Sequence, residues 1–430
     1  VLVVAVPVYL ICAFAIAGSR QLEAGRMDAL ASHHTLVRWL LGLLGIPVAL
    51  LGVWAIAIAL VGPSSLHRLA ISAREGSWIG LHGAATGRGN AGFLYDTASG
   101  RSLRLPPFTS PTIAPNGSSA AWPVSRSAGR YELSAWDLTG APRELPLPGV
   151  VFPIWPALAI SPNGTRIATM DGSSLVVLEL ASARVLGSTS FPRSVPAKSL
   201  RFLTEDRVLF LEGSVSSGTT KVHEYDVAAR ALTSLFEIPA TNWSKGPDFS
   251  RDGTLCLTSD APGKLVLRSG RTGGVTATLV DDARSRAWGA LLPDGRIVAI
   301  VKKIDAPRTV SLHVFSREGL PERTLPLDGV FASFVGRTGA GRLVLSIIHR
   351  KGPVPEGAPT LSYSLVSVDV DASAASGDVK TLAQNVRVLR RDETLDLEPT
   401  PLVGIEGFEA SDRLVRVDET TGAVTPVLEP

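Results

Sequence analysis

A turn motif that recurs at a nearly fixed spacing constrains this chain more than any other feature. Its clearest copy lies in Leu158–Met170, where two short apolar runs, Leu158–Ile160 and Ile167–Met170, flank a Ser-Pro-Asn-Gly turn. Proline presets φ, and Asn-Gly accepts the positive φ that other residues resist, so this stretch predicts a β-hairpin. Related turns occur at Glu75–Gly76, Asn116–Gly117, Asn163–Gly164, Glu205–Asp206, Asp252–Gly253, Asp294–Gly295 and Ala340–Gly341. Successive gaps between their second residues are 41, 47, 42, 47, 42 and 46 residues.

A second marker repeats with a similar period. An apolar strand ends, and usually a turn follows, at Tyr95–Asp96, Trp136–Asp137, Leu178–Glu179, Tyr225–Asp226, Leu267–Arg268, Val314–Phe315, Val368–Asp369 and Val417–Asp418. Successive gaps are 41, 42, 47, 42, 47, 54 and 49 residues. Two markers with a shared period of roughly 40–50 residues predict a four-stranded blade repeated around an axis. We therefore expect an all-β fold in which residues 69–430 form an eight-bladed β-propeller, or a seven-bladed one if the first and last units share a blade.

These motifs resemble the TolB-type, WD-like propeller repeat. The inner hairpins look like the turn that joins its two inner strands, at Pro111–Trp122, Ala157–Met170, Gly246–Ser259 and Ala290–Val301. The outer-strand endings match its D-x-x-T-G turn, at Tyr95–Leu105, Trp136–Leu145 and Val417–Val427. The resemblance implies a propeller with both marker turns on one face and the binding loops on the opposite face. It implies no particular function, because such folds serve as binding platforms, sensors and enzyme modules alike.

Two apolar runs precede the repeats. Hydrophobic residues make up 45% of the chain and charged residues 19%, and the apolar excess is concentrated at the N-terminus. Residues 1–17 carry no charge and are just long enough to span a bilayer, and residues 40–62 form a second such run in which Pro47 predicts a kink. We expect two transmembrane helices joined by a connecting loop or interfacial helix at residues 18–39. A signal peptide and a buried helix pair are the competing interpretations.

The basic residues beside these runs predict an orientation. Arg20, Arg26 and Arg38 belong to the connecting loop, against Arg68 and Arg74 after the second run. Positive residues favour the cytoplasmic side, so the loop is expected there. The chain is then an integral membrane protein whose propeller is extracytoplasmic, in the periplasm or at the cell surface.

Composition and motifs argue against several chemistries. The net charge is +3 and no basic run occurs, so nucleic acid is not an expected partner. Two cysteines predict neither a disulfide framework nor a Cys-based zinc site. The histidines are scattered without metal-ligand spacing, and the G-x-S-x-G nucleophile elbow is missing. We therefore assign no catalytic, cofactor-binding or metal-binding residue and expect no cofactor.

Cations and tryptophans concentrate in the segments expected at the binding face. The cations are Arg284, Arg286, Lys302, Lys303, Arg350 and Lys351, and the tryptophans at the entries to inner strands are Trp155, Trp243 and Trp288. A basic rim with tryptophans would suit an anionic or peptide ligand through cation–π and charge-assisted contacts. The plainer interpretation is a solvated rim, with the tryptophans in the core between blades.

The favoured hypothesis is a membrane-anchored, non-enzymatic binding module that recognises a protein, peptide or envelope component through this face. In the alternative, residues 1–62 are the tail of a larger transporter-type permease, and the propeller is its accessory domain. A third hypothesis is an enzyme with a site at the propeller mouth, which the fold alone does not exclude. The expected partners are the membrane and a protein or peptide.

Overall fold

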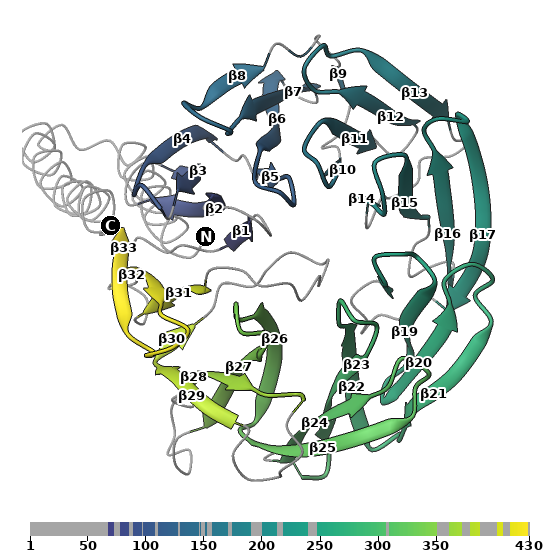
Figure 1. Cartoon of the computed structure of the whole chain (residues 1–430), viewed down its shortest axis with the longest axis vertical. Helices are drawn as coiled ribbons and strands as arrows, with labels where there is room; N and C mark the ends of the chain where they lie inside the picture. The colour runs from purple at the N-terminus through teal and green to yellow at the C-terminus, as the bar shows by residue number, and fades with distance from the viewer. Residues whose placement is uncertain are drawn as a thin grey trace, which may run out of the picture. The chain divides into compact units, whose positions relative to one another are not determined.

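The computed structural model describes residues 68–428, except for residues 73–77, 86–88, 97, 108–110, 128–129, 146, 148–150, 153–156, 171–173, 191–199, 213–217, 240–246, 307–308, 351–360, 372–378, 388–401 and 407–412. Within these ranges the regular elements are the β-strands β1–β33 (Figure 1). No helix in this described part has the length and hydrophobicity needed to cross a membrane. Both predicted transmembrane segments, residues 1–17 and 40–62, and the connector at 18–39 lie outside the described residues.

The N-terminal half of the described chain forms four sheets. The first contains β1 (Arg68–Ser72), β2 (Trp78–Ala85), β3 (Gly89–Asp96) and β4 (Ser102–Pro107). The second contains β5 (Thr112–Ile113), β6 (Ser119–Ser127), β7 (Arg130–Asp137) and β8 (Arg143–Leu145), and β9 (Val151–Phe152) also pairs with β7. The third contains β10 (Ala157–Ile160), β11 (Arg166–Met170), β12 (Ser174–Glu179) and β13 (Val185–Ser190). The fourth contains β14 (Leu200–Phe202), β15 (Arg207–Glu212), β16 (Thr219–Asp226) and β17 (Ala231–Pro239).

The C-terminal half repeats this plan. The fifth sheet contains β18 (Asp248–Phe249), β19 (Leu255–Ala261), β20 (Lys264–Ser269) and β21 (Val275–Asp281). The sixth contains β22 (Ser285–Leu291), β23 (Ile297–Lys303), β24 (Thr309–Phe315) and β25 (Pro321–Asp328). The seventh contains β26 (Phe331–Arg337), β27 (Leu343–Arg350), β28 (Leu361–Val368) and β29 (Val379–Gln384). The eighth contains β30 (Val386–Arg387), β31 (Leu402–Glu406), β32 (Arg413–Val417) and β33 (Val424–Leu428).

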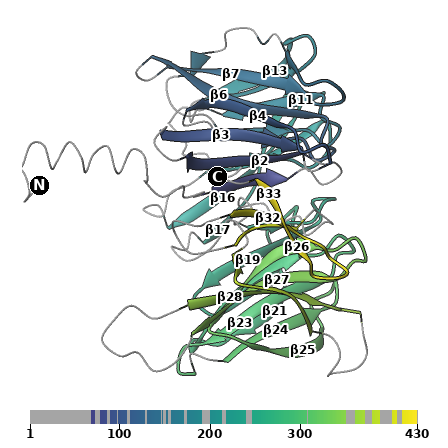
Figure 2. The same ribbon diagram turned by 90° about the vertical axis from the view of Figure 1, so that its left-hand side faces the viewer.

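Each sheet is an antiparallel meander of consecutive strands, as short turns require. The sheets follow one another around a common centre, with the first strand of each sheet toward the centre and the fourth toward the periphery (Figure 1). Figure 2, turned by 90°, shows strands of the first two sheets, such as β2, β3, β6 and β7, lying in layers. None of the described sheets combines strands from the two ends of the chain. Four-stranded sheets repeated around an axis define the β-propeller architecture.

The hairpin predicted in Leu158–Met170 is confirmed by β10 and β11, which pair in antiparallel register. In its turn Gly164 has a φ of 75°, and its N–H donates to the carbonyl of Ser161 over 2.9 Å. Asn163 Oδ1 accepts a hydrogen bond from the N–H of Thr165 at 3.0 Å, which closes an Asx turn. The turn is therefore built by local side-chain chemistry.

Neighbouring sheets are joined at these turns. Asn116 Nδ2 donates to the carbonyl of Asn163 over 2.7 Å, and the N–H of Asn163 donates to Glu205 Oε1 over 2.7 Å. Arg317 Nη2 donates to Asp252 Oδ2 over 3.0 Å and so joins the sixth sheet to the fifth. The face of the propeller that carries these turns is thus held together by hydrogen bonds from one turn to the next. The geometry of these turns thus serves the fold.

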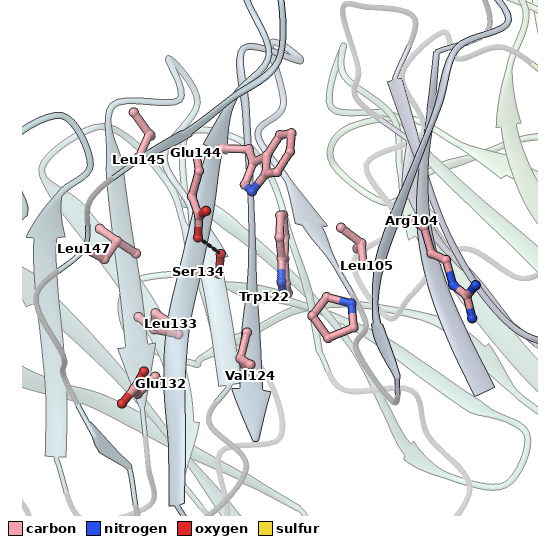
Figure 3. Close-up of a pocket in the computed structure, with 12 residues that line it drawn as sticks. Arg104, Leu105, Trp122, Val124, Glu132, Leu133, Ser134, Glu144, Leu145 and Leu147 are labelled. Carbon is pink, nitrogen blue, oxygen red and sulfur yellow. Dashed lines mark hydrogen bonds between the residues drawn. The ribbon is translucent and has the colours of Figure 1, made fainter. Parts of the chain in front are cut away.

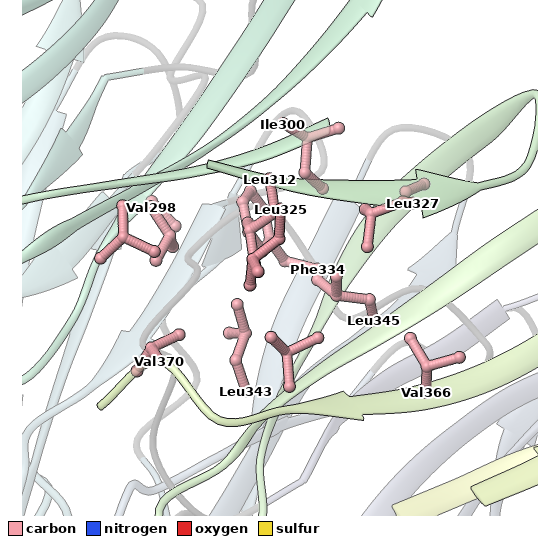
Figure 4. Close-up of a cluster of buried hydrophobic side chains, with 14 of the residues drawn as sticks. Val298, Ile300, Leu312, Leu325, Leu327, Phe334, Leu343, Leu345, Val366 and Val370 are labelled. Carbon is pink, nitrogen blue, oxygen red and sulfur yellow. The ribbon is translucent and has the colours of Figure 1, made fainter. Parts of the chain in front are cut away.

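The apolar core lies between consecutive sheets. The second strand of each sheet has neighbours on both faces, so β15 is buried at its four central residues, whereas the outer strand β17 is mostly exposed. The largest cluster joins the sixth and seventh sheets (Figure 4). It includes Val298, Ile300, Leu312, Leu325 and Leu327 from the sixth sheet, with Phe334, Leu343, Leu345, Val366 and Val370 from the seventh sheet and the turn after β28. This cluster supports the candidate site.

Candidate functional site

The predicted binding residues are described only in part. Five of them belong to the sixth sheet or to the turn before it: Arg284, Arg286, Trp288, Lys302 and Lys303. Trp155, Trp243 and Lys351 lie outside the described residues, and Arg350 ends β27 without a described side chain. We call the four cations Arg284, Arg286, Lys302 and Lys303 the sixth-sheet rim.

The turn that enters β22 is organised by Asp282. Ser285 Oγ donates to Asp282 Oδ2 over 2.7 Å, and the N–H of Arg284 donates to Asp282 Oδ1 over 2.9 Å. The ammonium of Lys303 pairs with the same carboxylate. The hydrogen bond from Lys303, followed by those from Ser285 and Arg284, holds the pKa of Asp282 well below its usual range. Lys303 is thus engaged within the protein, and Asp282 serves the turn.

The hairpin of β22 and β23 sets two cations opposite each other. In its register Arg286 faces Lys302, and Trp288 faces Ile300. Directly opposed side chains have Cβ atoms about 5 Å apart, and like charges at such positions repel. Because side chains alternate along a strand, Arg286 and Trp288 project from the same side of β22. The rim therefore places positive charge beside an indole ring.

An aromatic pair borders this charge. The ring of Trp288 stacks on that of Phe331, with centroids 5.0 Å apart and planes inclined by 21°. Phe331 begins β26, the first strand of the seventh sheet, and its side chain is 38% exposed. Trp288 also packs against the core cluster between the two sheets. It therefore combines the two roles considered for the tryptophans, since it belongs to the inter-sheet core and also borders the rim.

Phe331 and Ile304 are site residues that the sequence patterns did not single out. Ile304 directly follows β23, is 54% exposed, and donates its N–H to the carbonyl of Arg284 over 2.8 Å. Phe331 lies far from Trp288 in the sequence and belongs to the next repeat. A search for apolar residues at or next to the ends of predicted strands could have identified both residues.

A partly buried histidine–carboxylate pair occurs in the fourth sheet. His223 Nε2 lies 2.7 Å from Glu212 Oε2, and the imidazole stacks on Phe210 with centroids 5.0 Å apart. The side chain of His223 is 9% exposed and that of Glu212 is 35% exposed. Burial raises the pKa of the Cys256 thiol, which keeps it protonated and unreactive. Among the side chains that the structure describes, no group of three or more His, Cys, Asp or Glu residues is placed to hold a metal ion.

Neither a family model nor a curated relative matches the sequence. Solved structures do match. A eukaryotic initiation factor is 12% identical with a TM-score of 0.51, over 84% of this chain and 87% of that one. The C-terminal WD40 domain of Sif2 is 12% identical with a TM-score of 0.47, over 84% and 94%. The β-propeller domain of the Trilobed protease from Pyrococcus furiosus is 12% identical with a TM-score of 0.47, over 75% and 98%. At this identity the likeness concerns the fold alone, and the class of the protein is a β-propeller with WD-like repeats.

Proposed function

We propose that this protein is a membrane-anchored, eight-bladed propeller of the TolB-type, WD-like class that acts as a non-enzymatic interaction scaffold. The two uncharged segments at residues 1–17 and 40–62 support the anchor. The excess of arginines in the loop between them supports an extracytoplasmic propeller. Eight markers at the ends of strands support the blade number.

The proposed partner is an acidic, extended peptide segment that carries an aromatic residue. The observation that carries this proposal is the opposition of Arg286 and Lys302 beside the stacked pair of Trp288 and Phe331. A carboxylate of the peptide could form charge-assisted hydrogen bonds with both cations. An aromatic side chain would cover Phe331, which is exposed. The charge would guide the encounter, and the aromatic contact would add affinity.

The proposal is tested by measuring the binding of labelled peptides to the full chain by fluorescence anisotropy. The probe is an extended glutamate-rich peptide with one central tryptophan, and the comparison peptide has glutamine in place of glutamate. We expect the glutamate peptide to bind more tightly, with an affinity that falls as salt is added, because screening weakens charge contacts. The double variant Arg286→Ala and Lys302→Ala should lose about tenfold or more in affinity.

A matched control removes two exposed arginines elsewhere. Arg143 and Arg184 lie near the outer turns of the second and third sheets, with side chains 72% and 67% exposed. The double variant Arg143→Ala and Arg184→Ala changes the net charge equally and should bind the peptide as the wild type does. Phe331→Ala should weaken binding without changing its salt dependence. Equal losses in both double variants would show a non-specific charge effect and refute the assignment of the rim.

A further inference from the structure

A hollow between the first and second sheets is the strongest feature that the proposed scaffold role does not use (Figure 3). Its volume is about 540 Å³, which is within the range of pockets that hold small organic molecules. One wall comes from β4, with Arg104 and Leu105, and the other comes from β6, β7 and β8 of the second sheet. It therefore lies away from the sixth-sheet rim along the chain and in the fold.

Two indoles form part of its lining. Trp122 in β6 and Trp136 in β7 have ring centroids 6.2 Å apart and planes inclined by 40°. Trp122 is 2% exposed, and within the described part of the chain its Nε1–H has no hydrogen-bond partner. A buried donor without an acceptor costs free energy, so most buried indoles are paired. Figure 3 shows the ring of Trp122 between Val124 and Leu105, at the hollow.

Two carboxylates line the same wall of the hollow as the indoles. Glu144 in β8 is exposed and accepts a hydrogen bond from Ser134 Oγ at 3.1 Å. Glu132 lines the hollow from β7, and Arg104 is the cation on the facing wall. The exposed carboxylate of Glu144 favours a ligand that offers an amino group over one that offers an acid. The indole N–H of Trp122 would be satisfied by a hydrogen-bond acceptor on the ligand.

We propose that this hollow binds a small planar aromatic heterocycle that carries both an amino group and a ring nitrogen acceptor. The ring lies against the indoles, where aromatic rings stack favourably. The ring nitrogen accepts the hydrogen bond of Trp122 Nε1–H, and the amino group donates to Glu144. This site is independent of the peptide partner proposed above.

Adenine is a suitable probe because it has both groups, and purine is its matched comparison because it lacks the amino group. Binding to the full chain is measured by calorimetry and by quenching of tryptophan fluorescence. We expect saturable binding at one site per chain, with adenine bound about tenfold more tightly than purine. Glu144→Ala, which removes the acceptor, should remove most of the difference between adenine and purine. Trp122→Phe should weaken both probes by a similar factor of about ten.

The controls separate this site from the rim and from folding defects. The variant Arg286→Ala and Lys302→Ala should bind adenine normally, whereas Glu144→Ala should bind the acidic peptide normally. Thermal unfolding of Trp122→Phe shows whether it folds, and Glu144→Ala decides the outcome if it does not, because Glu144 is exposed. The proposal is overturned if neither probe saturates, or if adenine binds the Glu144→Ala variant as tightly as the wild type.

Discussion

At the scale of single residues, Gly164 shows how one turn serves both its own hairpin and its neighbour. Its φ of 75° lies in the left-handed region that side chains with a Cβ resist. A Cβ added there would also lie 1.9 Å from Ser118 Oγ and 3.0 Å from Asn116 Oδ1, both in the turn of the preceding sheet. The glycine is required by backbone conformation and by close approach of two sheets.

Gly164→Ala should lower the free energy of unfolding by about 1–3 kcal/mol, since it adds backbone strain and displaces the neighbouring turn. Chemical denaturation of the full chain measures the change. Gly140→Ala is the control, because no atom lies within 4 Å of the Cβ position at Gly140. A loss in Gly164→Ala no larger than that in Gly140→Ala would contradict this role.

At the scale of elements, stability depends on the apolar layers between sheets. Leu345 in β27 has an exposed fraction of 0% and belongs to the cluster between the sixth and seventh sheets. The same cluster packs against Trp288, so it also supports the aromatic pair of the rim. The elements that hold the fold and those that present the candidate site are thus in direct contact.

Leu345→Ala should lower the free energy of unfolding by about 2–5 kcal/mol, through lost apolar burial and the cavity that remains. The control is Val379→Ala in β29, where the side chain is 43% exposed and its loss should change stability little. Denaturant titration compares the two variants. Similar small losses in both would mean that this layer contributes little to folding.

At the scale of the whole molecule, the repeated meander explains how a long chain forms one propeller from short strands. A single four-stranded sheet is too thin to bury both of its faces, so each is covered by the sheets before and after it. The described strands lie within residues 68–428. The proposed membrane anchor concerns the residues before them and sets where the candidate sites would be presented.

Reporter fusions test the anchor and its orientation. Alkaline phosphatase is active only outside the cytoplasm. When it is fused after Pro430, we expect it to be active. The same reporter inserted within residues 18–39 should be inactive, because the positive residues of this loop favour the cytoplasm. The full chain should also stay with membranes after an alkaline wash. The reverse pattern of reporter activity would contradict the proposed localisation, and release by the wash would contradict the anchor.

The markers read from the sequence correspond closely to the observed strands. Strands end at or next to the predicted positions Asp96, Asp137 and Glu179, and the predicted turn at Asn163 has its expected hydrogen bonds. Such turns depend on interactions among a few neighbouring residues, so they can be recognised from the sequence. The functional role of the basic residues Arg284 and Arg286 stays a prediction, and Lys303 is held by Asp282.

The rest depends on contacts between residues that are distant in the sequence. Prolines, glycines and short polar side chains specify turns locally, which is why the repeat and its strands follow from the residues alone. The opposition of Arg286 and Lys302 depends on hairpin register, and the stacking of Trp288 on Phe331 depends on how two sheets pack. The hollow beside Trp122 likewise arises where the first and second sheets meet. Packing between repeats is not determined by residues that are close in the sequence, so only the tertiary structure reveals these juxtapositions.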